Sequence, residues 1–165
     1  MKLYLMRHGP AEDVAESGLD ADRMLTPKGR ERVRDVAKLL VAEDEAPLHV
    51  MSSPLVRAVQ TAEIVAAVTC VHDRAGSLTI RRELALGEGG LALVDVLRHA
   101  PMKRTILVGH EPDMSALAGH LLGRPLQVPF SKAMVVSFAL DGVEVTHRFI
   151  LDPRELRIDR VDRRR

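Results

Sequence analysis

The chain has 165 residues, of which 46% are hydrophobic and 28% are charged, and this composition is typical of a soluble globular domain with one apolar core. A formal net charge of +1 argues against a basic nucleic-acid surface and against attraction to an anionic membrane. The aromatic content of 2% excludes a stacking platform for single-stranded nucleic acid.

The first predicted strand is the apolar run "KLYLM", residues 2–6, which ends abruptly in the turn residues "RHGP". A polar stretch follows it. Thr26 and Pro27 then predict the start of a helix that runs to about residue 43, because one side chain can cap the helix and the other suits its first position. Apolar residues recur along this helix at the spacing of a single buried face.

The second predicted strand is "LHVM", residues 48–51, and a helix is expected directly after it. Ser53 is expected to cap that helix, one residue before the proline that opens it. Residues 68–82 show no clear pattern, although "SLTI" at 77–80 has the character of a short strand. The apolar spacing of "LALVDVLRHA", residues 91–100, predicts another helix.

A β-branched core strand is predicted for "RTILV", residues 104–108. Pro112 is expected to open the next helix and Gly123 to end it. The sequence "AMVVSFALDGVEVTHRFIL" predicts a β-hairpin with Asp141-Gly142 as its two-residue turn. The basic tail from Arg157 onward is expected to be a solvated, frayed terminus.

These elements predict a three-layer α/β/α sandwich, with a mainly parallel central sheet, helices on both faces and a C-terminal antiparallel hairpin. Neither an internal repeat nor a linker divides the chain, so we expect one domain over residues 1–165. The single cysteine, Cys70, rules out an intramolecular disulfide, agrees with a reducing compartment and is expected to be a buried thiol. Because no apolar run suits a signal peptide or a membrane span, we expect a cytoplasmic protein.

Basic and imidazole residues follow three of the predicted strands. Arg7 and His8 follow the first strand, and Arg57 lies in the first turn of the helix after the second. His110 follows the strand at 104–108. Ligands of such sheets bind beyond the carboxyl ends of the strands, and helix N-termini at the same edge favour anions. Because a guanidinium group donates two hydrogen bonds to phosphate oxygens, the set predicts one compact phosphoryl site.

Each of the four residues also has an ordinary structural explanation. A lone histidine is usually a surface residue or a hydrogen-bonded core residue, and a lone helical arginine is usually solvated. Their coincidence at one predicted sheet edge is what favours a functional site.

At this point the sequence matches a known pattern. The segments "LMRHG", "SSPLVRAVQTAEI" and "LVGHEP" closely resemble the signatures of the histidine phosphatase superfamily. The segments "DRMLTPKG", "GHEPDMSALAGHLLG" and "DPREL" look most like its small phosphohistidine phosphatase (SixA-like) branch, and the similarity runs from Leu3 to about Leu156. The resemblance implies a phosphoglycerate mutase-like fold and a phosphohistidine intermediate on His8. It places Arg7, Arg57 and His110 in the phosphate pocket.

The expected mechanism needs a neutral His8, whose pKa the two arginines should lower. One ring nitrogen attacks phosphorus, and the other is expected to donate to a backbone carbonyl. A protonated His110 would help the arginines to neutralise the transition state. The superfamily often uses a carboxylic acid after its third strand, and the resemblance makes Glu83 the candidate acid, with Glu88 as a second; either can also be a plain surface carboxylate.

The sequence therefore predicts a metal-independent hydrolase that needs no cofactor, because it contains no cluster with metal-ligand spacing. The first candidate substrate is a phosphohistidine-bearing signalling protein. The loops after His8, Met51 and His110 look short, which leaves an open site for such a protein. A small phosphomonoester is the alternative substrate. A non-catalytic phosphate-binding module is a third possibility, disfavoured because a pure binder needs no nucleophile. No nucleic-acid or membrane partner is expected.

Overall fold

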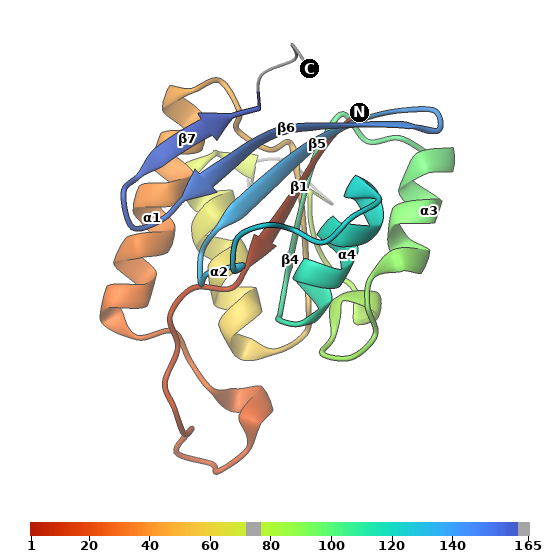
Figure 1. Cartoon of the computed structure of the whole chain (residues 1–165). Coiled ribbons are helices and arrows are strands. Elements are labelled where there is room, and N and C mark those ends of the chain that lie inside the picture. Colours follow the sequence, from red (N-terminus) through yellow and green to blue (C-terminus); the bar gives the residue numbers. More distant parts are fainter. Residues whose placement is uncertain (72–76, 162–165) are drawn as a thin grey trace.

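A computed structural model describes residues 1–71 and 77–161 of the chain, and the seven strands found there form one mixed sheet (Figure 1). The strands are β1 Lys2–Arg7, β2 His49–Ser52, β3 Leu78–Ile80, β4 Arg104–Gly109, β5 Val135–Asp141, β6 Glu144–Asp152 and β7 Arg157–Arg160. Their order across the sheet is β3-β2-β4-β1-β5-β6-β7. The first four strands in this order are parallel, and β5, β6 and β7 add antiparallel pairings.

Helices cover both faces of the sheet (Figure 1). They are α1 Pro27–Ala42, α2 Val56–Val68, α3 Leu91–His99 and α4 Asp113–Leu122, with short 3-10 turns η1 at Asp20–Asp22 and η3 at Arg82–Leu84. Alternate side chains of β1 pack against the helices on opposite faces of the sheet. Tyr4 and Met6 pack with α1 and α2, whereas Leu3 and Leu5 pack with α3 and α4. This period of two is that of a central strand buried on both faces. The predicted α/β/α sandwich is confirmed.

The register of the parallel strands brings the predicted site residues to one edge. Arg7 at the end of β1 pairs with Gly109 at the end of β4, and Ser52 at the end of β2 pairs with Val108. The residues that follow these three strands therefore emerge side by side. Thr26 caps α1 by accepting a hydrogen bond from the Gly29 N–H, as the sequence predicts.

Two predicted starts and turns lie elsewhere in the structure. The helix α2 begins at Val56, Leu55 is its extended N-cap residue, and Ser53 does not cap it. Ser53 is fully buried at the end of β2, and its hydroxyl contacts His110 instead. The hairpin turn is Gly142-Val143, one residue later than predicted, because Asp141 still pairs with its partner across the strands and Gly142 adopts the positive φ of 57°.

Three other expectations are wrong. Residues 157–160 form β7 against β6 rather than a frayed tail, and the remainder of that tail, 162–165, lies outside the described residues. Cys70 is exposed, at a positive φ of 56° just beyond the end of α2. The segment after His8 is not short: residues 8–26 separate β1 from α1 and project beyond the sheet edge (Figure 1). Among the described residues, no helix has the length and apolarity to cross a bilayer.

Gly29 in α1 lies directly against Pro10 of this segment, so its substitution should lower the free energy of unfolding. A Cβ atom on Gly29 would lie 1.9 Å from the Pro10 carbonyl oxygen, which accepts a hydrogen bond from the Thr26 N–H. We expect Gly29→Ala to lower the free energy of unfolding by about 1–3 kcal/mol in urea titrations.

Gly119→Ala in α4 is the matched control, because its nearest neighbour would be a comfortable 3.6 Å away. Replacing a helical glycine by alanine there should leave stability unchanged or raise it by about 0.5–1 kcal/mol. Equal effects of the two substitutions would show that the Pro10 contact does not constrain α1.

Candidate active site

His8 follows β1 directly, and only 5% of its surface is exposed. Its Nδ1 atom lies 2.7 Å from the carbonyl oxygen of Gly9. Because a carbonyl oxygen only accepts hydrogen bonds, Nδ1 carries the ring proton and Nε2 keeps its lone pair free. The expected hydrogen bond to a backbone carbonyl is present, and it makes Nε2 the atom able to attack an electrophile.

The turn beneath His8 is held by both neighbouring helices. The Gly9 N–H donates to Oγ1 of Thr61 at 3.1 Å, and the Thr61 hydroxyl donates to the Arg57 carbonyl oxygen at 2.7 Å. A Cβ atom on Gly9 would lie 2.5 Å from Cγ2 of Val33, so a larger residue would displace that side chain. The backbone that carries the imidazole is therefore fixed on two sides.

His110 follows β4 and faces His8, with 5.2 Å between the ring centroids. It is almost fully buried, and its Nε2 lies 2.7 Å from the Ser53 hydroxyl oxygen. That oxygen also accepts a hydrogen bond from the Leu55 N–H at 3.3 Å. When the hydroxyl donates its proton to Nε2, the Nδ1 nitrogen of His110 carries the ring proton and remains a donor.

The two predicted arginines lie beside these imidazoles. Nη1 of Arg7 donates to the Phe130 carbonyl oxygen at 2.9 Å. Arg57, only 4% exposed, donates through Nη1 to the Asp20 carbonyl oxygen at 2.7 Å and through Nη2 to the Asp20 carboxylate at 2.9 Å. The structure therefore brings His8, Arg7, Arg57 and His110 together, as their positions in the sequence predict.

Three buried nitrogen atoms of this cluster, Nε of Arg7, Nε of Arg57 and Nδ1 of His110, have no hydrogen-bond partner among residues 1–71 and 77–161. Buried polar groups are rarely left unpaired in proteins, and buried cations require a compensating charge. An anion with several acceptor oxygens satisfies both requirements, so the cluster is suited to bind a tetrahedral oxyanion such as a phosphoryl group.

Both histidines are neutral near pH 7. Burial above all, together with repulsion from Arg57, Arg7 and a protonated His110, lowers the pKa of His8 to about 3, although the hydrogen bond to Gly9 opposes this shift. Burial and the charges of Arg57 and Arg7 lower the pKa of His110 to about 4. The direction of the His8 pKa shift agrees with the neutral His8 that nucleophilic attack needs, and burial rather than the arginines is its larger cause. In the unliganded protein the same arginines disfavour a third positive charge on His110, and the protonated His110 expected in the transition state stays a prediction.

Glu83 lies in η3, and its carboxylate accepts hydrogen bonds from Arg81, one of them at 3.3 Å from Nε. The same arginine lowers the pKa of Glu83. An acid that protonates a leaving group must hold its proton, so this contact weighs against Glu83 in that role. Glu88 is exposed in the loop before α3. The acid role of either carboxylate stays a prediction.

Sequence reasoning missed two polar neighbours of the cluster. Ser53 was assigned to a helix start because a serine before a proline after a strand is typical of one, and only the strand register shows that it faces His110. Asp20 lies in a polar stretch with no periodic pattern, so nothing local indicates that it reaches Arg57. The described residues also contain no group of three or more His, Cys, Asp or Glu side chains arranged to hold a metal ion.

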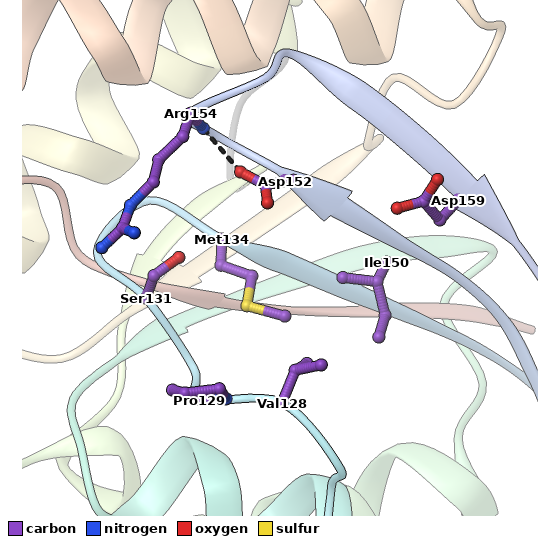
Figure 2. A pocket seen from close by; sticks show the side chains of 8 residues that line it. All are labelled: Val128, Pro129, Ser131, Met134, Ile150, Asp152, Arg154 and Asp159. Carbon is purple, nitrogen blue, oxygen red and sulfur yellow. Dashed lines mark hydrogen bonds between the residues drawn. The ribbon is translucent and has the colours of Figure 1, made fainter.

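A groove of about 320 Å³ lies next to the start of β5 and the end of β6 (Figure 2). One side of it is formed by the segment 128–134, which also contacts the cluster: Phe130 accepts a hydrogen bond from Arg7, and the Ala133 N–H donates to the carbonyl oxygens of Arg7 and His8. Apolar side chains line the groove between the polar side chains of its rim, and the lining residues are Val128, Pro129, Ser131, Met134, Ile150, Asp152, Arg154 and Asp159.

One family model and two related sequences each match a large part of this chain. Residues 3–84 match the family model of the histidine phosphatase superfamily (branch 1). An uncharacterized protein of Picosynechococcus sp. is 39% identical over 121 residues, which cover 72% of this chain and 71% of that protein. The phosphohistidine phosphatase SixA of Escherichia coli is 26% identical over 143 residues, which cover 86% of each chain.

Comparison with solved structures extends the similarity to almost the whole chain. The structure of the protein histidine phosphatase SixA complexed with tungstate superposes with a TM-score of 0.82 and 28% identity, covering 95% of this chain and 100% of that one. A phosphoserine phosphatase mutant from Entamoeba histolytica, in complex with phosphoserine, superposes with a TM-score of 0.70 and 16% identity, covering 94% and 98%. At that identity the second likeness shows a common fold alone.

The lowered pKa values of the two histidines can be tested by NMR. We expect the ring signals of His8 and His110 to stay at neutral-imidazole shifts as the pH falls from about 8 to about 5, whereas all histidines of the urea-unfolded chain titrate near pH 6.5. The unfolded chain then binds protons that the native chain refuses, so stability should fall as the pH drops from about 6.5 towards 4. A native midpoint near 6.5 for either residue would contradict the assignment.

Proposed function

We propose that this chain, which belongs to the histidine phosphatase superfamily, removes phosphoryl groups from phosphohistidine side chains of a protein. The observation that carries the proposal is the free lone pair on Nε2 of His8, held next to two arginine cations and a third unpaired donor. A nucleophile without anion-binding groups would not support phosphoryl transfer through an enzyme intermediate, and neither would anion-binding groups without a nucleophile.

The first step is the attack of Nε2 of His8 on phosphorus. A P–N bond to His8 forms while the bond from phosphorus to the substrate nitrogen breaks, and the departing imidazole takes the bonding electron pair. Nδ1 of His8 keeps its proton throughout, because it donates a hydrogen bond to the Gly9 carbonyl oxygen. That hydrogen bond stabilises the positive charge that the ring acquires.

The transition state spreads negative charge over the equatorial oxygens of the phosphoryl group. The N–H groups of Arg7, Arg57 and His110 that lack partners are suited to these oxygens. Each preorganised donor of this kind contributes roughly 2.7–4 kcal/mol, or 10²–10³ in rate. An incoming dianion also favours proton uptake by His110, which the unliganded site resists.

The second step hydrolyses the intermediate. Water attacks phosphorus, its oxygen forms the new P–O bond, and the P–N bond to His8 breaks. The electron pair returns to Nε2, and the proton that water loses leaves with inorganic phosphate or passes to solvent. His8 is then neutral again with its proton on Nδ1, ready for another cycle.

A protein phosphohistidine substrate is favoured by two relatives that are themselves phosphohistidine phosphatases. The SixA structure that matches nearly the whole chain is that of a protein histidine phosphatase, and it binds tungstate, a tetrahedral oxyanion like phosphate. The groove (Figure 2) adds a surface for the backbone around a phosphohistidine, since the segment 128–134 lines it and also contacts Arg7 and His8.

A small phosphomonoester is the second candidate, because the fold also occurs in a phosphoserine phosphatase. An alkoxide leaving group needs an added proton, whereas the exchange of one P–N bond for another depends on it less. With Glu83 paired to Arg81 and its pKa lowered, that carboxylate is a poor acid for an alkoxide leaving group, which favours the phosphohistidine substrate.

The proposal predicts the outcome of a substrate panel. We expect kcat/KM for a phosphohistidine-bearing protein domain to exceed kcat/KM for phosphoserine, sugar phosphates and p-nitrophenyl phosphate by about tenfold or more, because only the protein can use the groove. Phosphate release is the readout, and His8→Ala controls for contaminating activity. A single small metabolite turned over far faster than any phosphoprotein would replace the proposal with the second candidate.

Glu83→Gln supplies a further arm of the same panel. We expect this variant to retain phosphohistidine hydrolysis within about twofold, since that carboxylate is engaged by Arg81. A selective loss on aliphatic phosphomonoesters would assign Glu83 as their acid. A loss of about 10²-fold on phosphohistidine itself would contradict the mechanism above.

A further inference from the structure

The contact between Arg57 and Asp20 joins the cluster to a segment outside the predicted site. Arg57 has five N–H groups, and Asp20 accepts from both terminal nitrogens, one with its carbonyl oxygen and one with its carboxylate. Nε–H remains unpaired and buried, and each terminal nitrogen retains a second hydrogen. Asp20 therefore holds the terminal nitrogens of the guanidinium group, and Nε–H stays available to another acceptor.

Asp20 is itself held in place. Its other carboxylate oxygen accepts a hydrogen bond from Nη1 of Arg23 at 2.8 Å, and Nε of Arg23 donates to the Glu12 carbonyl oxygen at 2.6 Å. The Glu12 N–H donates to the Met24 carbonyl oxygen, and the Met24 N–H donates to the Glu12 carboxylate. These hydrogen bonds restrain the conformation of the segment. They therefore fix the Asp20 carboxylate beside Arg57, although 55% of its side chain is exposed.

We propose that Asp20 is a positioning residue, which fixes the guanidinium of Arg57 so that its Nε edge faces the phosphoryl oxygens. The inference rests on the proposed function, since it assumes that an oxyanion enters the cluster. Arg57 has no other hydrogen bond from its side chain among the described residues. Without the Asp20 carboxylate, only the backbone carbonyl of residue 20 and packing would hold the guanidinium group.

A carboxylate so near the cluster has two other possible roles. As a general acid, Asp20 would need to hold a proton, but hydrogen bonds from Arg23 and then Arg57 lower its pKa. As a plug that competes with phosphate for Arg57, it would weaken anion binding by its negative charge. If Asp20 were a plug, removing its carboxylate would therefore strengthen anion binding. If Asp20 positions Arg57, the same change should weaken anion binding, although it also removes a repulsive charge.

Three variants separate these roles. Asp20→Ala removes the carboxylate that accepts from Nη2 and leaves the backbone carbonyl that accepts from Nη1, and Asp20→Asn restores one side-chain acceptor oxygen without the charge or the acid. Asp22→Ala is the matched control, because Asp22 is in the same η1 turn and its carboxylate bonds only to the Ser17 hydroxyl. The readouts are the Kd of vanadate by calorimetry, kcat and KM on p-nitrophenyl phosphate, and the thermal unfolding midpoint.

We expect Asp20→Ala to weaken vanadate binding and to lower kcat/KM by about tenfold or more, since small misplacements of a catalytic group can cost on the order of 10²-fold. Asp20→Asn should recover most of both losses. Asp22→Ala should stay within about twofold of the wild type, and all three unfolding midpoints should agree within a few degrees.

Tighter vanadate binding by Asp20→Ala would overturn the inference in favour of a plug. Equal losses by the Asn and Ala variants would point to the charge or to an acid and would equally overturn it. Because vanadate and an aryl phosphate report on the cluster whatever the natural substrate is, a failed substrate panel would reject the phosphohistidine proposal and leave this test intact.

Discussion

The burial of positive charge at one edge of the sheet is the constraint on which the rest of the structure depends. Arg57 is almost wholly removed from water, Arg7 is half-buried, and two imidazoles are packed against them. Buried cations need compensating charges and acceptors; the Asp20 carboxylate pairs with Arg57, but Nε of both arginines and Nδ1 of His110 still lack acceptors in the described part of the unliganded protein. An oxyanion supplies both the charge and the acceptors, so the site gains more from binding phosphate than an exposed basic patch would.

The same constraint explains why both histidines are neutral. The neighbouring cations and the lack of water make a further positive charge unfavourable, so His8 keeps a free lone pair at physiological pH. His110 shares this environment and is aligned by Ser53 rather than by a carboxylate. A histidine that is neutral near pH 7 needs no general base to activate it as a nucleophile.

The sequence predicts the sheet and the four residues at its edge because both follow from short-range patterns. Strand ends and helix starts are marked by apolar runs and prolines, and parallel strands must bring their carboxyl ends together. The contacts of Ser53 and Asp20 could not be predicted, since each depends on a partner far along the chain: His110 for one and Arg57 for the other. The strand β7 was likewise decided by its pairing with β6 rather than by local propensity.

The account depends most on which nitrogen of His8 receives the phosphoryl group. Chain labelled with ¹⁵N-histidine can be mixed with a phosphohistidine-bearing protein, quenched in alkali within milliseconds and examined by ³¹P–¹⁵N correlation NMR. Because the Gly9 carbonyl occupies Nδ1, the account predicts that phosphorus is bonded to Nε2 of His8. Phosphorus on Nδ1, on His110 or on no residue of the chain would contradict it.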